Sequence, residues 1–316
     1  MIQQIQNIAS LSMRGGRNDN FYFTLIEYYP ESDRWFLKSL LPVKEEEAVN
    51  QDEAIRAWID SFQITDLVLD IPQSRPACYH CELDCPGAES CEVTSVKETR
   101  RQIKNLLNED QKLLASNPKK YEQERNLADE IVFNRSLFDK ETHTHLLSRS
   151  FKRRLKKGFI PYWNRPIDFY LWKYYYDPIL ELFKTSYDSF GNTSLMTLSR
   201  FNYIKRHFPK SVHLHEANQQ IVLLELLRSK HLLRKDIELI NDIELGFETR
   251  LELIKKIESH LNIFIYSHDL EILVKKPQAF DSFLLALAGQ NYLLNKNIIM
   301  PQWAYPDETR FIIPQF

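Results

Sequence analysis

Residues 66–72 read DLVLDIP, a short apolar run closed by a carboxylate and a proline. Such a run, bounded by turn-forming residues, is typical of a strand buried on both faces. We expect this strand at 67–71, with Asp70 at its end. Because ligands in open α/β sheets bind outside the carboxyl ends of the strands, Asp70 is a candidate site residue. The alternative is that Asp70 only caps the turn before Pro72.

Three strands and a helix precede this run. An imperfect alternation of apolar residues predicts the first strand. Two runs rich in aromatic and branched residues, separated by the turn at 30–33, then predict a hairpin. A spacing of three to four residues between apolar positions predicts the helix that follows. The four segments are 4–12, 21–29, 34–43 and 45–62.

Alternation of helices and strands resumes after Asn192. Strands are expected at 212–216 and within 308–314, a short apolar run lies at 263–266, and helices are expected at 192–207, 219–230, 235–243, 247–261 and 280–294. In the strand VHLHE, we expect His213 and His215 on the exposed face. We expect residues 1–72 and 192–316 to form an α/β core. We expect residues 73–191 to form a largely helical inserted lobe.

Composition narrows the class of protein. The chain has 316 residues, a net charge of −2, 43% hydrophobic residues and 27% charged residues, which is ordinary for a globular protein. It contains seven glycines with one adjacent pair at 15–16, which argues against a nucleotide cofactor. No window is as apolar as a membrane span, and the first ten residues do not have the pattern of a signal peptide. We therefore expect a cytoplasmic protein with no membrane partner.

All four cysteines lie in the segment CYHCELDCPGAESC, at Cys78, Cys81, Cys85 and Cys91. Four thiolates at this spacing indicate a closed, tetrahedral zinc site with a structural role, in a loop at 73–95. Thiols stay reduced in the cytoplasm, which favours metal ligation over disulfides. An iron–sulfur cluster is the rival interpretation, and His80 is an alternative ligand.

Two further carboxylates have unusual positions. Glu216 ends the strand VHLHE on its apolar face, and Asp281 shares a helical face with Leu284. Burying an unpaired charge is costly, so each carboxylate favours a cation nearby. Together with Asp70 they form a set that holds Mg²⁺ or Mn²⁺ for phosphodiester hydrolysis. The alternatives are that Glu216 faces solvent and that Asp281 is the N-cap of a helix starting at Ser282.

Several stretches resemble the predicted RNase H-fold nucleases, a largely uncharacterised bacterial family. They are LVLDIPQSRP, VHLHEAN, GFETRLELI, FDSFLLALAGQ and TRFIIP, within about residues 1–75 and 192–316. The cysteine loop is similar to a feature of one branch of that family. The resemblance implies an RNase H-like sheet, with three antiparallel strands followed by parallel strands and flanking helices. It also implies metal-dependent hydrolysis of nucleic acid, with Asp70, Glu216 and Asp281 as metal ligands.

The first strand departs from the family pattern. RNase H-like nucleases carry an aspartate there, whereas this strand reads NIASLS and has Ser10 and Ser12 near that position. The next carboxylate is Asp19, in the following turn. Either Asp19 reaches the site, or metal binding is weakened, or hydrolysis is lost. The second hypothesis is therefore a nucleic-acid-binding protein without catalysis that keeps a structural zinc loop, and the third is an iron–sulfur protein.

The inserted lobe carries a basic run, RSFKRRLKK, at 149–157. Its cations suit contacts with the phosphate backbone, and the aromatic residues within 159–176 offer ring faces on which unpaired bases stack. The basic residues are Arg149, Lys152, Arg153, Arg154, Lys156 and Lys157. The alternative is a solvated helix face followed by aromatic residues of a core.

Overall fold

The computed structural model describes residues 6–13, 21–43, 51–123, 147–305 and 310–316. Contacts divide the chain into two compact units. Unit 1 comprises Met1–Gln73, Thr193–Ile299 and Thr309–Phe316, and unit 2 comprises Ser74–Asn192 and Met300–Glu308. The first segment of unit 2 matches the inserted lobe that the sequence predicts at 73–191 to within one residue at each end. The sequence did not predict that the segment Met300–Glu308 would belong to this unit.

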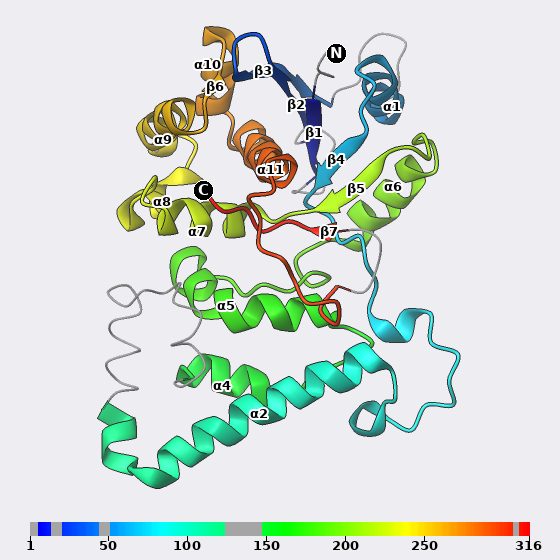
Figure 1. Ribbon diagram of the computed structural model, residues 1–316, viewed down its shortest axis with the longest axis vertical. Helices are drawn as coiled ribbons and strands as arrows, with labels where there is room; N and C mark the ends of the chain where they lie inside the picture. Colours follow the sequence, from blue (N-terminus) through cyan, green and yellow to red (C-terminus); the bar gives the residue numbers. More distant parts are fainter. Residues whose placement is uncertain (1–5, 14–20, 44–50, 124–146, 306–309) are drawn as a thin grey trace. The chain divides into compact units, whose positions relative to one another are not determined.

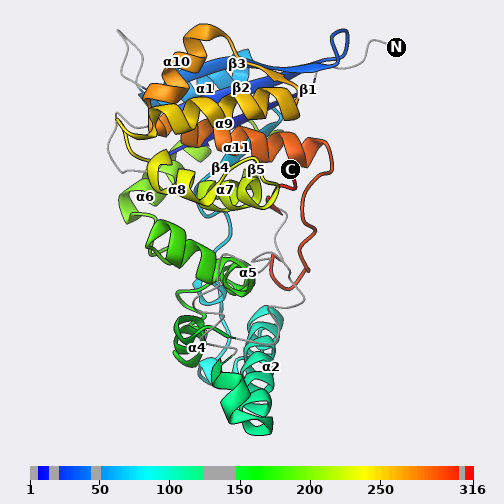
Figure 2. The ribbon, with the colours of Figure 1, turned by 90° about the vertical axis from the view of Figure 1, so that its left-hand side faces the viewer.

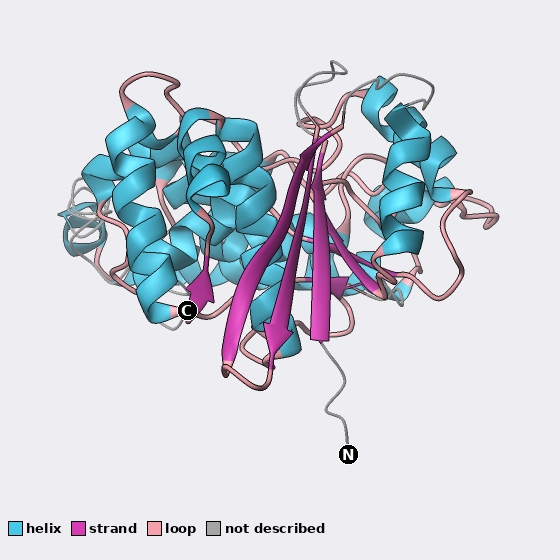
Figure 3. Ribbon diagram, turned by 90° about the horizontal axis from the view of Figure 1, so that it is seen from above, coloured by secondary structure: helices cyan, strands magenta, loops and turns pink. Residues whose placement is uncertain are grey.

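Unit 1 is built on a mixed sheet, in which the described strands have the order β6-β3-β2-β1-β4-β5-β7. β1 pairs antiparallel with β2, which pairs antiparallel with β3, whereas β1, β4 and β5 run parallel. The edge strands β6 and β7 run parallel to β3 and β5. The predicted mixed α/β class is therefore confirmed, and Figure 3 shows the twist of the sheet. The strands are β1 (Gln6–Ser12), β2 (Tyr22–Tyr29), β3 (Arg34–Pro42), β4 (Asp66–Leu69), β5 (His213–Glu216), β6 (Ile263–Phe264) and β7 (Arg310–Phe311).

Helices lie on both faces of this sheet (Figures 1 and 3). α11 packs against β1, β2 and β4 on one face and also contacts α7 and α10. On the other face, the ring of Trp58 from α1 lies 5.4 Å from the ring of Phe23 on β2. The helices of unit 1 are α1 (Gln51–Ser61), α6 (Leu195–Lys205), α7 (Gln219–Arg228), α8 (Arg234–Ile240), α9 (Gly246–His260), α10 (Ser267–Lys275) and α11 (Pro277–Leu293).

The packing of α11 on β1 is close because of one glycine. A Cβ atom on Gly289 would come within 2.5 Å of the Ile8 side chain, so any other residue here would displace Ile8. The α11 residues from Ser282 to Asn291 are all buried, although Asp281 beside them is only half-buried. This helix therefore forms the centre of the core of unit 1.

Three details of unit 1 differ from the sequence-based expectations. α11 begins at Pro277, whose fixed φ suits the first helical turn, so the alternative of Asp281 as an N-cap is wrong. The sequence did not predict α10. His215 is 4% exposed, against the expectation, because its ring packs 4.6 Å from that of Tyr292 on α11, whereas His213 is exposed as expected. Parts of the segments expected at 4–12, 45–62 and 308–314 lie outside the described residues.

Unit 2 is largely helical in its described part (Figure 2). Its helices are α2 (Thr94–Ser116), α4 (Arg149–Lys156) and α5 (Pro166–Phe183), which contact one another, and the short 3-10 helices η2 (Ala77–Tyr79) and η3 (Ala88–Ser90). Most aromatic residues of the 159–176 block are buried, including Trp172 and Tyr175. They build the core of this unit. No helix in the described part of the chain has the length and apolarity needed to cross a membrane.

Candidate functional site

Asp70 follows β4, at the carboxyl edge of the parallel strands. Its carboxylate accepts hydrogen bonds from Ser12 Oγ at 2.9 Å, from the Met13 backbone N–H at 3.0 Å and from Gln219 Nε2 at 2.7 Å. These neutral donors come from β1, the residue after it and α7. Asp70 therefore ties three elements together at the end of the sheet, in addition to any role in binding a ligand.

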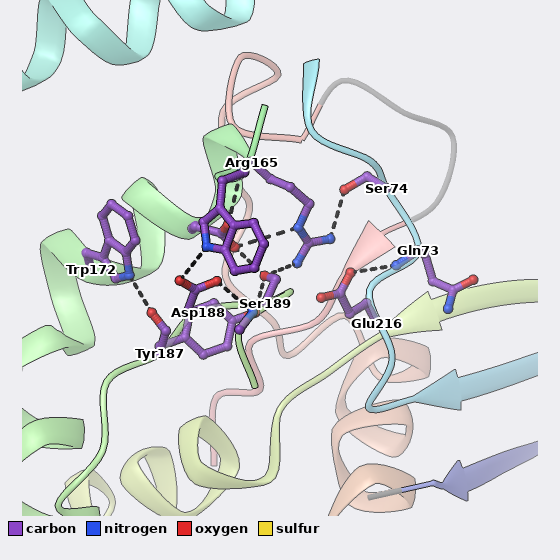
Figure 4. Close-up of polar contacts among 11 residues, drawn as sticks. Gln73, Ser74, Arg165, Trp172, Tyr187, Asp188, Ser189 and Glu216 are labelled. Atoms are coloured by element: carbon purple, nitrogen blue, oxygen red, sulfur yellow. Dashed lines mark hydrogen bonds and ion pairs between the residues drawn. The ribbon is translucent and has the colours of Figure 1, made fainter. Parts of the chain in front are cut away.

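Glu216 lies at the same edge of the sheet as Asp70. It is the last residue of β5, pairs in register with Leu69 of β4, and is 3% exposed. Its Oε2 accepts a hydrogen bond from the Gln73 backbone N–H at 3.0 Å (Figure 4). The structure thus brings two of the three expected carboxylates to the ends of adjacent parallel strands.

Asp281 lies in the second turn of α11 and has a cationic neighbour. Burial lowers the pKa of Arg250 on α9, and the negative charges of Asp242 and Asp281 oppose that shift. Among the described residues, no three His, Cys, Asp or Glu side chains are arranged to hold a metal ion. Asp19 lies outside the described residues. The assignment of these acidic residues as metal ligands remains a prediction.

The centre of β1 is occupied by hydroxyl groups. Ser10 is fully buried, and its Oγ donates to Ser282 O at 2.7 Å. Thr24 Oγ1 donates to Ser282 Oγ at 2.8 Å, which in turn donates to Tyr22 O at 2.9 Å. This neutral network joins β1, β2 and α11. It contains no carboxylate.

The cysteine loop has almost no core of its own. Residues 79–90 are all exposed, and Gly87 adopts a positive φ of 91° that other residues rarely adopt. The backbone N–H of Cys78 donates to Pro161 O at 3.2 Å, which fastens the start of the loop. Burial raises the pKa of the Cys78 thiol, and the negative charges of Cys91, Cys81 and Cys85 raise it further. The four thiols are therefore near one another, although in the described residues they are not arranged to coordinate one metal ion.

The four-thiol donor set fits zinc chemically. Thiolate is a ligand that zinc prefers, and closed four-cysteine sites stabilise loops that bury little apolar surface. The exposed segment between Cys78 and Cys91 is such a loop. An iron–sulfur cluster uses the same donors.

The basic helix α4 uses two of its cations within unit 2. Lys152 forms an ion pair with the buried Asp110, and the guanidinium of Arg154 lies 4.0 Å from the ring centre of Trp172. The side chains of Phe151 and Leu155 are buried against the unit. The exposed cations of the run are Arg149, Arg153, Lys156 and Lys157, and Arg149 also lies 3.5 Å from Glu122.

Exposed aromatic side chains lie close to this helix in sequence. Tyr162 is 71% exposed and Trp163 is 44% exposed, and Trp163 Nε1 donates to Asp188 Oδ2 at 2.9 Å. Tyr79, in the cysteine loop, is 67% exposed. The hydrogen bond between Cys78 and Pro161 joins the two segments that carry these rings.

Unit 2 contains a buried charged cluster that the sequence analysis missed. Arg165 and Asp168 are fully buried, and the Arg165 backbone N–H and guanidinium both contact the Asp168 carboxylate. Ser189 bonds both side chains, and Arg165 also donates to Ser74 Oγ at 2.9 Å (Figure 4). Burial raises the pKa of Asp168 to about 6, although Arg165 opposes the shift. Pro166 at the first helical position, with an acid two residues later, was the available sequence signal.

Searches against protein-family models, curated proteins and solved structures find no match to this chain. The functional argument therefore depends on the geometry of the two units.

Proposed function

We propose that this protein binds nucleic acid through unit 2. The observation that carries the proposal is the row of exposed cations along α4 and at its C-cap: Arg149, Arg153, Lys156 and Lys157. In a chain of net charge −2, a local cluster of this kind supplies the attraction for phosphates that overall charge does not.

The row has the geometry of a backbone contact. Positions 149, 153 and 156 are spaced by four and three residues, so they share one face of the helix. The distance from 149 to 157 is about 12 Å at 1.5 Å per residue, so these cations can contact several neighbouring phosphates of one strand. Phe151 and Leu155 bury the opposite face, so the helix presents its cations from a fixed position.

Exposed aromatic rings favour an unpaired strand as the ligand. The rings of Tyr162 and Trp163 follow α4 closely in the chain, and exposed rings of this kind stack on bases of any sequence. Tyr79 adds a third ring on the cysteine loop. We propose that the four cysteines bind one structural zinc ion there, which would hold this loop in shape.

The strand order supports an RNase H-like origin for unit 1. Antiparallel β3-β2-β1 followed by parallel β4 and β5 is the arrangement that the resemblance implies. The buried Ser10–Ser282 network, in place of a first-strand aspartate, favours the form of the proposal without hydrolysis.

Metal-dependent hydrolysis of phosphodiester bonds is the second candidate function. It is favoured by Asp70 and Glu216, whose carboxylates follow adjacent parallel strands at one edge of the sheet. Asp70, Glu216 and Asp281, with Asp19, are the proposed ligands of Mg²⁺ or Mn²⁺. A divalent ion held there would stabilise the charge that develops on the phosphate.

Binding of a fluorescent single-stranded oligonucleotide, followed by anisotropy at 0.1 M salt, tests the first proposal. We expect the triple variant Arg153→Gln, Lys156→Gln, Lys157→Gln to bind about 100-fold more weakly, because each lost phosphate contact removes ~0.7 log units at this salt concentration. The matched control is Arg206→Gln, Lys210→Gln, Lys235→Gln, which removes three exposed cations from unit 1. Equal affinity of the two variants would contradict the proposal.

A cleavage assay distinguishes the second candidate. Wild-type protein is incubated with the same oligonucleotide and Mg²⁺ or Mn²⁺, in parallel with Glu216→Gln. Metal-dependent cleavage that disappears in Glu216→Gln supports hydrolysis. Binding without cleavage supports the non-catalytic form.

A further inference from the structure

The turn between α8 and α9 exposes four large apolar side chains, although its backbone is held in place. The guanidinium of the buried Arg250 donates to Ile240 O and Asp242 O, both at 2.6 Å. The Asp242 carboxylate accepts hydrogen bonds from the backbone N–H groups of Glu244 and Leu245. A partner that binds this turn therefore does not have to order its backbone, which lowers the cost of association. The apolar residues, which are 39–67% exposed, are Leu239, Ile243, Leu245 and Phe247.

Acidic residues lie between these apolar residues in the sequence. Residues 236–248 contain five acids and no lysine or arginine. The exposed acids of this stretch are Glu238, Asp242, Glu244 and Glu248. We call these four acids and the four exposed apolar residues the turn surface. A partner for the turn surface must offer apolar side chains together with positive charge.

Helix α6 presents a second exposed surface, and its charge is the opposite. Met196, Tyr203 and Arg206 are spaced by seven and three residues, so they share one helical face. Met196 is 65% exposed, Tyr203 is 51% exposed, and Leu195 at the start of the helix is 79% exposed. The stretch 189–215 contains four lysines and arginines and no acid. We call the following exposed residues the α6 surface: Leu195, Met196, Tyr203, Arg206 and Lys210.

The turn surface and the α6 surface complement each other in charge, and both expose apolar side chains. Figure 1 shows α8 and α6 on opposite sides of unit 1, so the two surfaces of one molecule do not meet. They can pair only between two copies of the chain. Such a contact joins two different surfaces, so each copy keeps one surface of each kind for a further neighbour.

We propose that the turn surface binds the α6 surface of a second copy of this chain. The contact removes apolar side chains of both copies from water, which supplies its affinity. The acids of one copy face Arg206 and Lys210 of the other, which fixes the orientation of the two copies. Repetition of this contact produces a ring or an open chain of copies. This inference goes beyond nucleic-acid binding by unit 2 and does not require it.

Sedimentation velocity of the full chain at increasing protein concentration, up to about 200 µM, tests the proposal. We expect the weight-average sedimentation coefficient of the wild type to rise with concentration. The rise should be smaller in about 0.5 M NaCl, because salt screens the exposed charges. Leu245→Ser should weaken the association about 10-fold, because it removes one of the most exposed apolar side chains of the turn surface.

Charge reversal of each surface identifies the two sides of the contact. One variant carries Glu244→Lys and Glu248→Lys, and the other carries Arg206→Glu and Lys210→Glu. Each variant alone should remain monomeric, because like charges then face each other across the contact. An equal mixture of the two should associate, since each reversed surface finds its opposite on the other variant. The control, Glu31→Lys with Glu109→Lys, makes the same change in charge at exposed positions outside both surfaces and should associate as the wild type does.

A sedimentation coefficient of the wild type that does not change with concentration would overturn the proposal, and this result does not depend on how any variant folds. Association that the charge-reversed variants keep when each is alone would also overturn it, because another surface would then be responsible. The α4 triple variant should associate as the wild type does. The unit 1 control variant of the oligonucleotide assay lacks Arg206 and Lys210, so it should associate less while it keeps oligonucleotide binding. These two variants separate this proposal from that for unit 2.

Discussion

The role of Asp70 can be tested by changing one atom of its side chain. In Asp70→Asn, the amide nitrogen replaces Oδ2, which accepts hydrogen bonds from Ser12 Oγ and Gln219 Nε2. Hydrogen bonds to a charged acceptor are each worth about 1.5–3 kcal/mol. Loss of two of them should therefore lower the free energy of unfolding by about 3 kcal/mol or more. The bond from Met13 to Oδ1 remains possible in the variant.

Urea denaturation in EDTA, followed by circular dichroism, measures this change without any divalent ion. The control is Asp60→Asn, an exposed acid in α1 whose surface ion pair with Arg56 should contribute less than ~1 kcal/mol. If Asp70→Asn left the stability unchanged or raised it in EDTA, Asp70 would not act as the hydrogen-bond acceptor that joins these elements. A repeat with Mg²⁺ shows separately whether the wild type gains stability that the variant does not.

Three other predictions concern the loop, the buried cluster and the first strand. Cys81→Ser should lose about one equivalent of bound zinc and be cleaved faster by proteases within 79–90. Because the Cys81 side chain is exposed, loss of packing would not explain these effects. A brown wild-type protein would instead indicate an iron–sulfur cluster. The pKa of Asp168 is about 6 in the folded protein, which is above its value in the unfolded chain. Asp168 therefore contributes stability at pH 4 that is lost as the pH rises through 6. Asp168→Asn should therefore remove roughly 3 kcal/mol of that pH dependence, and denaturation curves at pH 4 and 7 that keep it would contradict the assignment. Ser10→Asp places a carboxylate against Ser282 O and should lower the free energy of unfolding by about 3–5 kcal/mol, measured by thermal unfolding. The variant should not gain Mg²⁺-dependent cleavage. A gain of cleavage would show that the rest of the catalytic centre is intact.

Local patterns were sufficient to predict most elements of unit 1. The alternation in β1 and the aromatic runs of β2 and β3 match the observed strands within one or two residues over the described range. α10 was missed because it follows the short strand β6 almost directly and α11 begins soon after it, so no loop marks its ends. Its apolar residues Leu270, Leu273 and Val274 do have helical spacing, and this was the available signal.

Contacts between distant residues could not be predicted from the sequence. Ser10 and Ser282 are 272 positions apart, and only the packing of α11 on β1 brings them together. His215 was expected to be exposed because an alternating strand suggests one solvated face. β5 lies inside the sheet, and α11 brings Tyr292 against His215, whereas His213 at the start of the strand stays exposed.

The salt dependence of oligonucleotide binding tests the central claim most directly. The logarithm of the binding constant is measured against the logarithm of the NaCl concentration for the wild type, the α4 triple variant and the unit 1 control. Three lost contacts at ~0.7 each should reduce the slope by about 2 in the α4 variant and leave it unchanged in the control. The same slope for all three proteins would show that the cations of α4 do not contact phosphates, and would contradict the proposal that unit 2 binds nucleic acid.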